Sequence, residues 1–159
     1  ATLSPTRGLI LSGGLSYVDF KAKKVTNDPN LEAVFRANGR SSPNFVLRQQ
    51  PKWTANAGVF FEYPQEVFGG RLVFNSDLRY TSKYLEGDFY LASKTTVDAN
   101  IGINGIGGLG LDAKIIATNL FNEKFDYGSF GSSAANGYFS SLYGAPRIVS
   151  FQLRYRFGG

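Results

Sequence analysis

Cysteine, histidine and methionine are all missing from this sequence, and tryptophan occurs once. Without cysteine there can be no disulfide framework and no thiol chemistry, and without cysteine and histidine the usual zinc and copper sites are excluded. A Ser-His-Asp or Cys-His nucleophile is excluded on the same ground. The composition argues against most familiar hydrolase mechanisms, so we expect neither an enzyme nor a bound metal or cofactor.

Long apolar runs and signal-peptide features are also missing. No segment approaches the roughly 18–20 apolar residues of a membrane helix, and no basic n-region precedes an apolar core. The missing methionine and the turn-like start "SPTRG" (4–8) predict a piece of a longer chain. The net charge is +5, but the lysines and arginines are dispersed, so we expect no nucleic-acid partner.

What the sequence does contain is a period of two, whereas a period of 3.6 is nearly absent. In the last such segment, Val149, Phe151, Leu153, Tyr155 and Phe157 alternate with Ser150, Gln152, Arg154 and Arg156. Six segments alternate in this way, starting at Leu9 and covering 53–63, 71–84, 95–104, 109–118 and 147–157. They predict six strands with one apolar and one polar face.

The connections between these segments alternate between short and long. The links 64–70 and 105–108 are short and turn-rich, whereas 20–52, 85–93 and 122–146 are long and polar. We therefore expect all short turns at one rim of an antiparallel sheet and all long loops at the other. For the hairpin 95–118, charge pairing favours Asp98 opposite Lys114, because a slip of two residues would place Asp98 opposite Asp112.

Two environments suit such a two-faced sheet. In a soluble β-sandwich the apolar rows pack on each other. In a transmembrane β-barrel they contact lipid, and three features favour this alternative: strands of about 10–14 residues where about 5–6 is typical, aromatics toward the strand ends, and no charge in the central apolar rows of the last five strands. We therefore predict an all-β fold, an antiparallel transmembrane β-barrel wall of about six long strands.

Six strands are too few to close a membrane barrel, because the smallest ordinary ones have about eight. Either the 20–52 segment contains two further weak strands, at Val34–Arg36 and Phe45–Leu47, or the remaining strands belong to another part of the protein.

Two stretches near the C-terminus resemble the end of TonB-dependent outer-membrane receptors: "LDAKIIATNLFNEKFDYGSF" (111–130) and "LYGAPRIVSFQLRYRF" (142–157). The similar features are Asn119-Leu120-Phe121-Asn122 with a later aromatic at Phe125 or Tyr127, then Gly144-Ala145-Pro146-Arg147, then a last strand ending in Phe157. "GLILSGGLSYVDF", "PKWTANAGVFFEY" and "DLRYTSKY" resemble upstream strands of the same family in the same order.

The resemblance implies a barrel of about 22 strands, closed by an N-terminal plug that carries the TonB box. Residues 1–159 would form the C-terminal part of that barrel domain, without plug or TonB box. The implied location is the bacterial outer membrane, and the implied partners are its lipid, the rest of the barrel and plug, and TonB acting through the plug. Tyr155 and Phe157 resemble the terminal signal read by the barrel-assembly machinery, although Gly158 and Gly159 follow them.

The implied function is active uptake of a scarce nutrient, such as a ferric siderophore, cobalamin or a glycan. A passive porin-like or structural barrel and a soluble β-sandwich binding module remain as alternatives. Candidate contacts to a small-molecule ligand are the aromatics of the 122–146 loop, which can stack on flat ligands or merely pack and anchor the loop: Phe125, Tyr127, Phe130, Tyr138, Phe139 and Tyr143.

Charges in the polar rows form a second candidate set, facing the lumen of the expected barrel. These charges are Arg79, Lys83, Lys94, Asp98 and Lys114. They could attract an anionic substrate. Alternatively, the cations are neutralised by Asp77, Asp98 and Asp112 in the same rows.

Overall fold

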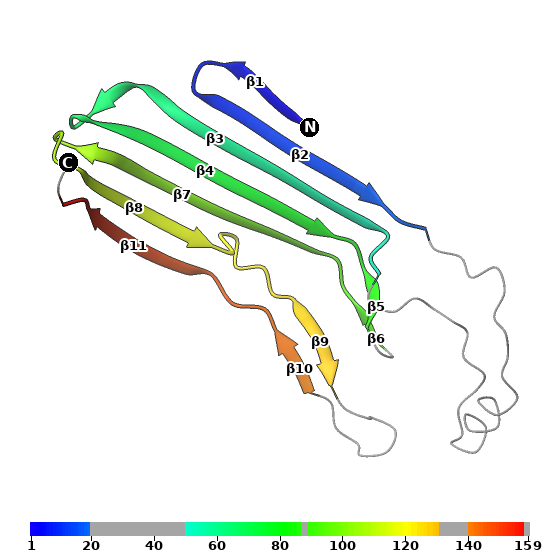
Figure 1. The fold of residues 1–159 in the computed structure, drawn as a ribbon. Helices are drawn as coiled ribbons and strands as arrows, with labels where there is room; N and C mark the ends of the chain where they lie inside the picture. Colours follow the sequence, from blue (N-terminus) through cyan, green and yellow to red (C-terminus); the bar gives the residue numbers. More distant parts are fainter. Residues whose placement is uncertain (20–49, 87–88, 131–139, 158–159) are drawn as a thin grey trace, which may run out of the picture.

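The computed structural model describes residues 1–19, 50–86, 89–130 and 140–157. In these residues the chain is all-β, and its main element is one seven-stranded antiparallel sheet in the order β1-β2-β3-β4-β7-β8-β11 (Figure 1). Two small two-stranded sheets, β5-β6 and β9-β10, extend it at one end. The strands are β1 (Thr2–Thr6), β2 (Leu9–Tyr17), β3 (Trp53–Val67), β4 (Gly70–Thr81), β5 (Tyr84–Glu86), β6 (Phe89–Leu91), β7 (Lys94–Ile106), β8 (Leu111–Thr118), β9 (Asp126–Phe130), β10 (Ser140–Tyr143) and β11 (Ile148–Tyr155).

All six predicted segments form neighbouring strands of this sheet, namely β2, β3, β4, β7, β8 and β11. The short connections lie together at one rim, called here the turn rim, and the long connections leave from the opposite loop rim (Figure 1). A backbone bond between Gly107 N–H and the Phe68 carbonyl (2.9 Å) ties two of the turns together. The predicted arrangement of the connections is confirmed for the described residues.

The sheet contains a seventh strand that the sequence pattern did not predict. β1 pairs with β2 through an irregularity between Leu3 and Thr6, in the segment expected to be a turn. Pro5 is compatible with this position because it lies in the irregular part of the β1-β2 pairing, where its missing N–H breaks no ladder bond with β2.

The hairpins β5-β6 and β9-β10 also lie in segments expected to be loops. The expected strand 71–84 is interrupted, since β4 ends at Thr81 and β5 begins at Tyr84. The weak strand candidates 34–36 and 45–47 lie outside the described residues.

The pairing register places all the predicted apolar rows on one face. One row of directly opposed residues crosses six strands without a polar side chain: Leu9, Phe61, Phe74, Ile101, Ile115 and Phe151. The polar rows, including Asp98 and Lys114, occupy the other face. The predicted division of faces is therefore confirmed across the whole sheet.

This sheet has almost no buried core. Leu91 is the one buried apolar residue within the described ranges, and it lies outside the main sheet. On the apolar face, Ile101, Ile115 and Phe151 are 45%, 50% and 64% exposed. No second sheet packs against this face in the part of the chain that the structure describes, so the two-layer packing of a β-sandwich is not formed. The sheet is also not closed, since β1 and β11 are opposite edges.

The expected register of the β7-β8 hairpin is wrong. Ile101 lies opposite Ile115 rather than Leu111, and Lys114 lies opposite Gly102 rather than Asp98. The last pair of the hairpin is Ile106 with Leu111, so the turn is formed by 107–110 rather than by the expected link 105–108. Glycines with positive φ at 105, 107, 108 and 110 permit this turn. Gly102 then fits beside Lys114, because a Cβ there would lie only 3.1 Å from the Lys114 Cβ.

Since the chain contains no native cysteine, paired cysteine substitutions report this register directly. Asn100→Cys with Ile116→Cys joins directly opposed positions, so we expect rapid disulfide formation under mild oxidation. Asp98→Cys with Lys114→Cys is the matched control, and its positions are offset by about 13 Å along the strands. Mass spectrometry of the oxidised variants would contradict the register if the control pair cross-linked more readily.

Candidate functional site

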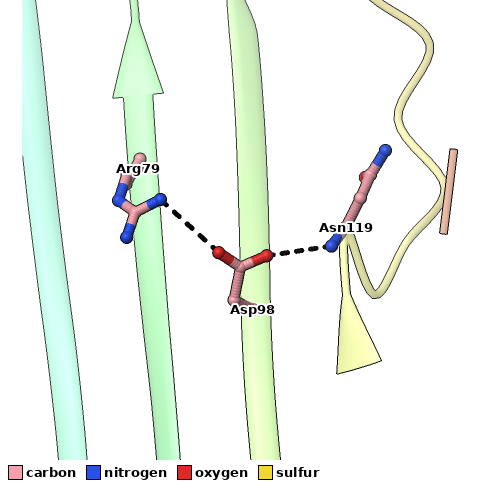
Figure 2. Close-up of polar contacts among 3 residues, drawn as sticks. All are labelled: Arg79, Asp98 and Asn119. Atoms are coloured by element: carbon pink, nitrogen blue, oxygen red, sulfur yellow. Dashed lines mark hydrogen bonds and ion pairs between the residues drawn. The ribbon is translucent and has the colours of Figure 1, made fainter. Parts of the chain in front are cut away.

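Charged side chains of the polar face pair across neighbouring strands. Arg79 on β4 and Asp98 on β7 form an ion pair at 3.5 Å (Figure 2). The second Asp98 oxygen accepts a hydrogen bond of 2.9 Å from the Asn119 backbone N–H. Arg71 likewise contacts Glu62 at 3.1 Å. Of the predicted lumen charges, Arg79 and Asp98 therefore neutralise each other, which agrees with the alternative that cations and carboxylates pair within the polar rows.

Asn119 organises the loop rim next to this pair. It is buried and has a φ of +48°, a conformation that asparagine tolerates better than most residues. Its side-chain amide donates to the carbonyls of Glu123 and Ala145, both at 2.9 Å. Its side-chain oxygen accepts from the Glu123 N–H at 2.8 Å. One side chain thus satisfies backbone groups from two segments far apart in the sequence.

A second asparagine completes this connection. The Asn122 side-chain oxygen accepts a hydrogen bond of 3.0 Å from the Arg147 backbone N–H. The Arg147 guanidinium reaches back to the Leu120 carbonyl at 3.5 Å. The segments 119–122 and 144–147, which carry the family resemblance, therefore form one hydrogen-bonded unit. We call this unit the rim knot. The sequence pattern marked both segments but did not show that they join.

The loop aromatics divide between packing and exposure. Phe125 and Tyr127 form an edge-to-face pair with ring centroids 5.2 Å apart, and the Lys94 ammonium lies 4.7 Å and 4.5 Å from the two centroids. Phe125 also lies against Gly144, where an added Cβ would overlap its ring. Phe125 and the predicted lumen charge Lys94 therefore hold the loop rim together.

The other candidate aromatics are less constrained. Tyr143 is exposed and lies opposite Asp126 in the β9-β10 hairpin. Phe130 ends β9, and its side chain is outside the described set. Tyr138 and Phe139 also lie outside the described residues. The structure therefore brings together Phe125, Tyr127 and Lys94 as one cluster.

A polar groove lies near the turn rim, on the same face as the Arg79–Asp98 pair. It is lined by side chains from β7, β8 and β11 and by the residue after β11: Asn104, Asp112, Lys114, Gln152, Arg154 and Arg156. We call it the turn-side groove. Lys114 was a predicted site residue, whereas its neighbours from the last strand were not. Their polar rows were visible in the sequence, but the β8-β11 register needed to place them beside Lys114 was not.

The proposed assembly signal lies on the apolar side of the last strand. Tyr155 and Phe157 form an edge-to-face pair with centroids 4.6 Å apart, and both side chains are exposed. The predicted lumen charge Lys83 is exposed between β4 and β5 and makes no ion pair within the described residues.

The described residues contain neither a metal-binding cluster nor a helix suited to cross a membrane. No group of three or more histidine, cysteine, aspartate or glutamate residues could hold a metal ion there. No helix among those residues has the length and hydropathy needed to span a membrane. The candidate site consists of the Arg79–Asp98 pair, the rim knot and the turn-side groove. Comparisons with protein-family models, with curated proteins and with solved structures gave no match.

We expect Asn119→Ala to lower the free energy of unfolding by about 2–4 kcal/mol. The substitution leaves the Glu123 N–H and the Ala145 carbonyl without partners and puts alanine at positive φ. Asn119→Gly removes the φ strain but not the loss of hydrogen bonds, so its cost should be intermediate. Denaturant titration measures both, with the exposed Asn104→Ala as control. Equal stability of Asn119→Ala and Asn104→Ala would contradict the rim knot's structural role.

Proposed function

We propose that this chain is a wall segment of a TonB-dependent outer-membrane receptor, the C-terminal part of a barrel that imports a scarce nutrient. The observation that carries this proposal is the uncovered apolar face. A row of six apolar residues crosses it, and its members at positions 101, 115 and 151 are roughly half exposed or more. Leaving a large apolar side chain in water rather than burying it costs about 1.5–3 kcal/mol. Such a face needs a continuous apolar partner, and lipid provides one.

Aromatic residues at both rims of the apolar face favour lipid over a second protein layer. At the loop rim, Tyr17 and Trp53 are in tilted contact with centroids 4.5 Å apart. At the turn rim, Tyr155 and Phe157 form the corresponding pair. Between the rims, one row is small, as in Ser76, Ala99 and Ala117, and the neighbouring row through Ile101 and Ile115 is apolar but also contains Phe61, Phe74 and Phe151. Aromatic girdles flanking an aliphatic band are typical of barrels that cross both membrane interfaces.

Strand length is consistent with the same placement. Eleven residues at a rise of about 3.3 Å and a tilt of about 40° span roughly 25–28 Å, which matches the lipid-facing band of about 25 Å. β3, β4 and β7 contain 15, 12 and 13 residues, whereas β2, β8 and β11, with 9, 8 and 8 residues, are shorter than the expected length of about 10–14 residues. A single-layer sheet with long strands tends to associate in water, because its edge strands have unpaired backbone groups and its apolar face is uncovered.

The two open edges argue for additional strands from the rest of the same protein. In hydrocarbon each unsatisfied backbone group costs several kcal/mol, so a membrane sheet must close. The outer edges of β1 and β11 have no neighbour within the described residues. In the proposed receptor, other strands of the barrel pair with both edges, and the polar face looks into the lumen and toward the plug.

Transport by a receptor, rather than passive diffusion, is supported by the resemblance of the rim segments and by their geometry. Asn119, Asn122 and Arg147 are used together in one hydrogen-bonded unit, so the resembling residues have a common structural role. Uptake makes and breaks no covalent bond, so it needs no nucleophile or metal. A signal peptide, TonB box and plug encoded before Ala1 in the parent gene would support the receptor, whereas an unplugged, ion-conducting protein would support a passive barrel.

A pair of adjacent isoleucines tests the lipid placement. Ile115 lies in the apolar row and Ile116 in the polar row of the same strand. In lipid vesicles, we expect Ile115→Lys to lower the free energy of unfolding by about 2–4 kcal/mol, because lysine then lies near the bilayer midplane. Ile116→Lys is the matched control and should cost well under half as much. Similar losses in denaturant titrations of both variants would contradict the placement.

A further inference from the structure

The turn-side groove carries more positive than negative charge. Three cations, Lys114, Arg154 and Arg156, surround one carboxylate, Asp112. The Asp112 oxygen Oδ1 accepts two hydrogen bonds, one of 2.8 Å from the Arg156 guanidinium and one of 2.9 Å from the Gly105 N–H. Asp112 therefore holds both the β7-β8 turn and the Arg156 guanidinium. Lys114 and Arg154 form no ion pair with any described residue, although Arg154 lies near enough to interact with the Asp112 charge. With three cations and one carboxylate, the groove keeps a net charge of +2.

The pairing register sets how these cations face the groove. Lys114 on β8 lies between Gly102 on β7 and Gln152 on β11. Gly102 leaves space beside the Lys114 stem, since an added Cβ would lie 3.1 Å and 3.2 Å from its Cβ and Cγ. Arg154 lies directly opposite Asp112, one same-face position along from Gln152. The ammonium and guanidinium groups thus belong to adjacent strands and border the same groove.

The remaining lining residues can also donate hydrogen bonds. Gln152 and Asn104 have side-chain amides, and each amide offers two N–H donors. A guanidinium with free N–H groups matches the paired oxygens of carboxylate or phosphate, and a lysine beside it adds a point charge. Two other arginines of the polar face differ from Arg154, because Arg79 and Arg71 each form an ion pair with a carboxylate.

We propose that the turn-side groove is a binding site for a small oxyanion, a phosphate or carboxylate group carried by a soluble molecule. Lys114 and Arg154 supply the charge, and Gln152 and Asn104 supply neutral donors. The site requires only the polar face and its register, so it goes beyond the proposed transport function and does not rest on membrane placement.

The test is titration of the isotope-labelled chain with inorganic phosphate and, separately, with citrate, followed by the amide NMR signals of Gly102, Lys114, Gln152 and Arg154. Ionic strength is held constant with sodium chloride, so that general screening does not change. We expect saturable shifts at these amides with at least one probe. Lys114→Gln and Arg154→Gln should each weaken binding about tenfold, the scale of one charge-assisted hydrogen bond.

Lys83→Gln and Arg7→Gln are the matched controls, since both residues are outside the groove and make no ion pair with described residues. Binding should be unchanged in both. Saturation with phosphate alone assigns a phosphate ligand, and saturation with citrate alone assigns a carboxylate. Shifts that do not saturate, or equal weakening in the control variants, would overturn the proposal. Arg154, Lys83 and Arg7 are exposed and Lys114 is half-buried, so these substitutions remove no core packing. An unchanged amide spectrum in the absence of anion verifies that each variant is folded.

Discussion

The stability of this sheet depends on what covers its apolar face. Strict alternation over six strands puts every aliphatic row on one side of a single layer, and no described residue covers that side. Backbone pairing alone does not stabilise such a sheet in water, because isolated strands need an apolar face packed on something to be stable. The same face makes a good lipid surface, since its central rows contain no charge. The membrane proposal, with its further barrel strands and inward polar face, rests on this constraint.

The polar side of the sheet shows how charge and hydrogen bonding are arranged once that face is fixed. Ion pairs join neighbouring strands at Arg79–Asp98 and Arg71–Glu62, and the rim knot ends the sheet at the loop rim. Asp98 connects the two systems, because it pairs with Arg79 and also accepts the Asn119 N–H (Figure 2). At the opposite rim, Asp112 serves a similar double role with Gly105 and Arg156, but this one carboxylate offsets only part of the charge of Lys114, Arg154 and Arg156. Structural charges and candidate binding charges are thus separated along one face.

The sequence was sufficient for the features that depend only on alternation. Side chains change faces at every residue, so the composition of each face and the six main strands could be read directly. The β7-β8 register could not, because it depends on how many residues the glycine-rich turn absorbs at positive φ. β1 was missed because Pro5 and Gly8 suggest a turn, although a strand accepts proline at an irregularity of its pairing. The rim knot and the turn-side groove depend on contacts between distant segments, such as Asn119 with Ala145, which no local pattern encodes.

The most direct measurement of the central claim is quenching of tryptophan fluorescence by brominated lipid. In a Trp53→Phe background, Ile115→Trp and Ile116→Trp place one tryptophan on each face of β8, and lipids brominated along the acyl chain quench only a ring that touches hydrocarbon. The account predicts strong quenching at position 115 and little at position 116. Equal quenching at both positions, or none at position 115 in a folded chain, would contradict it.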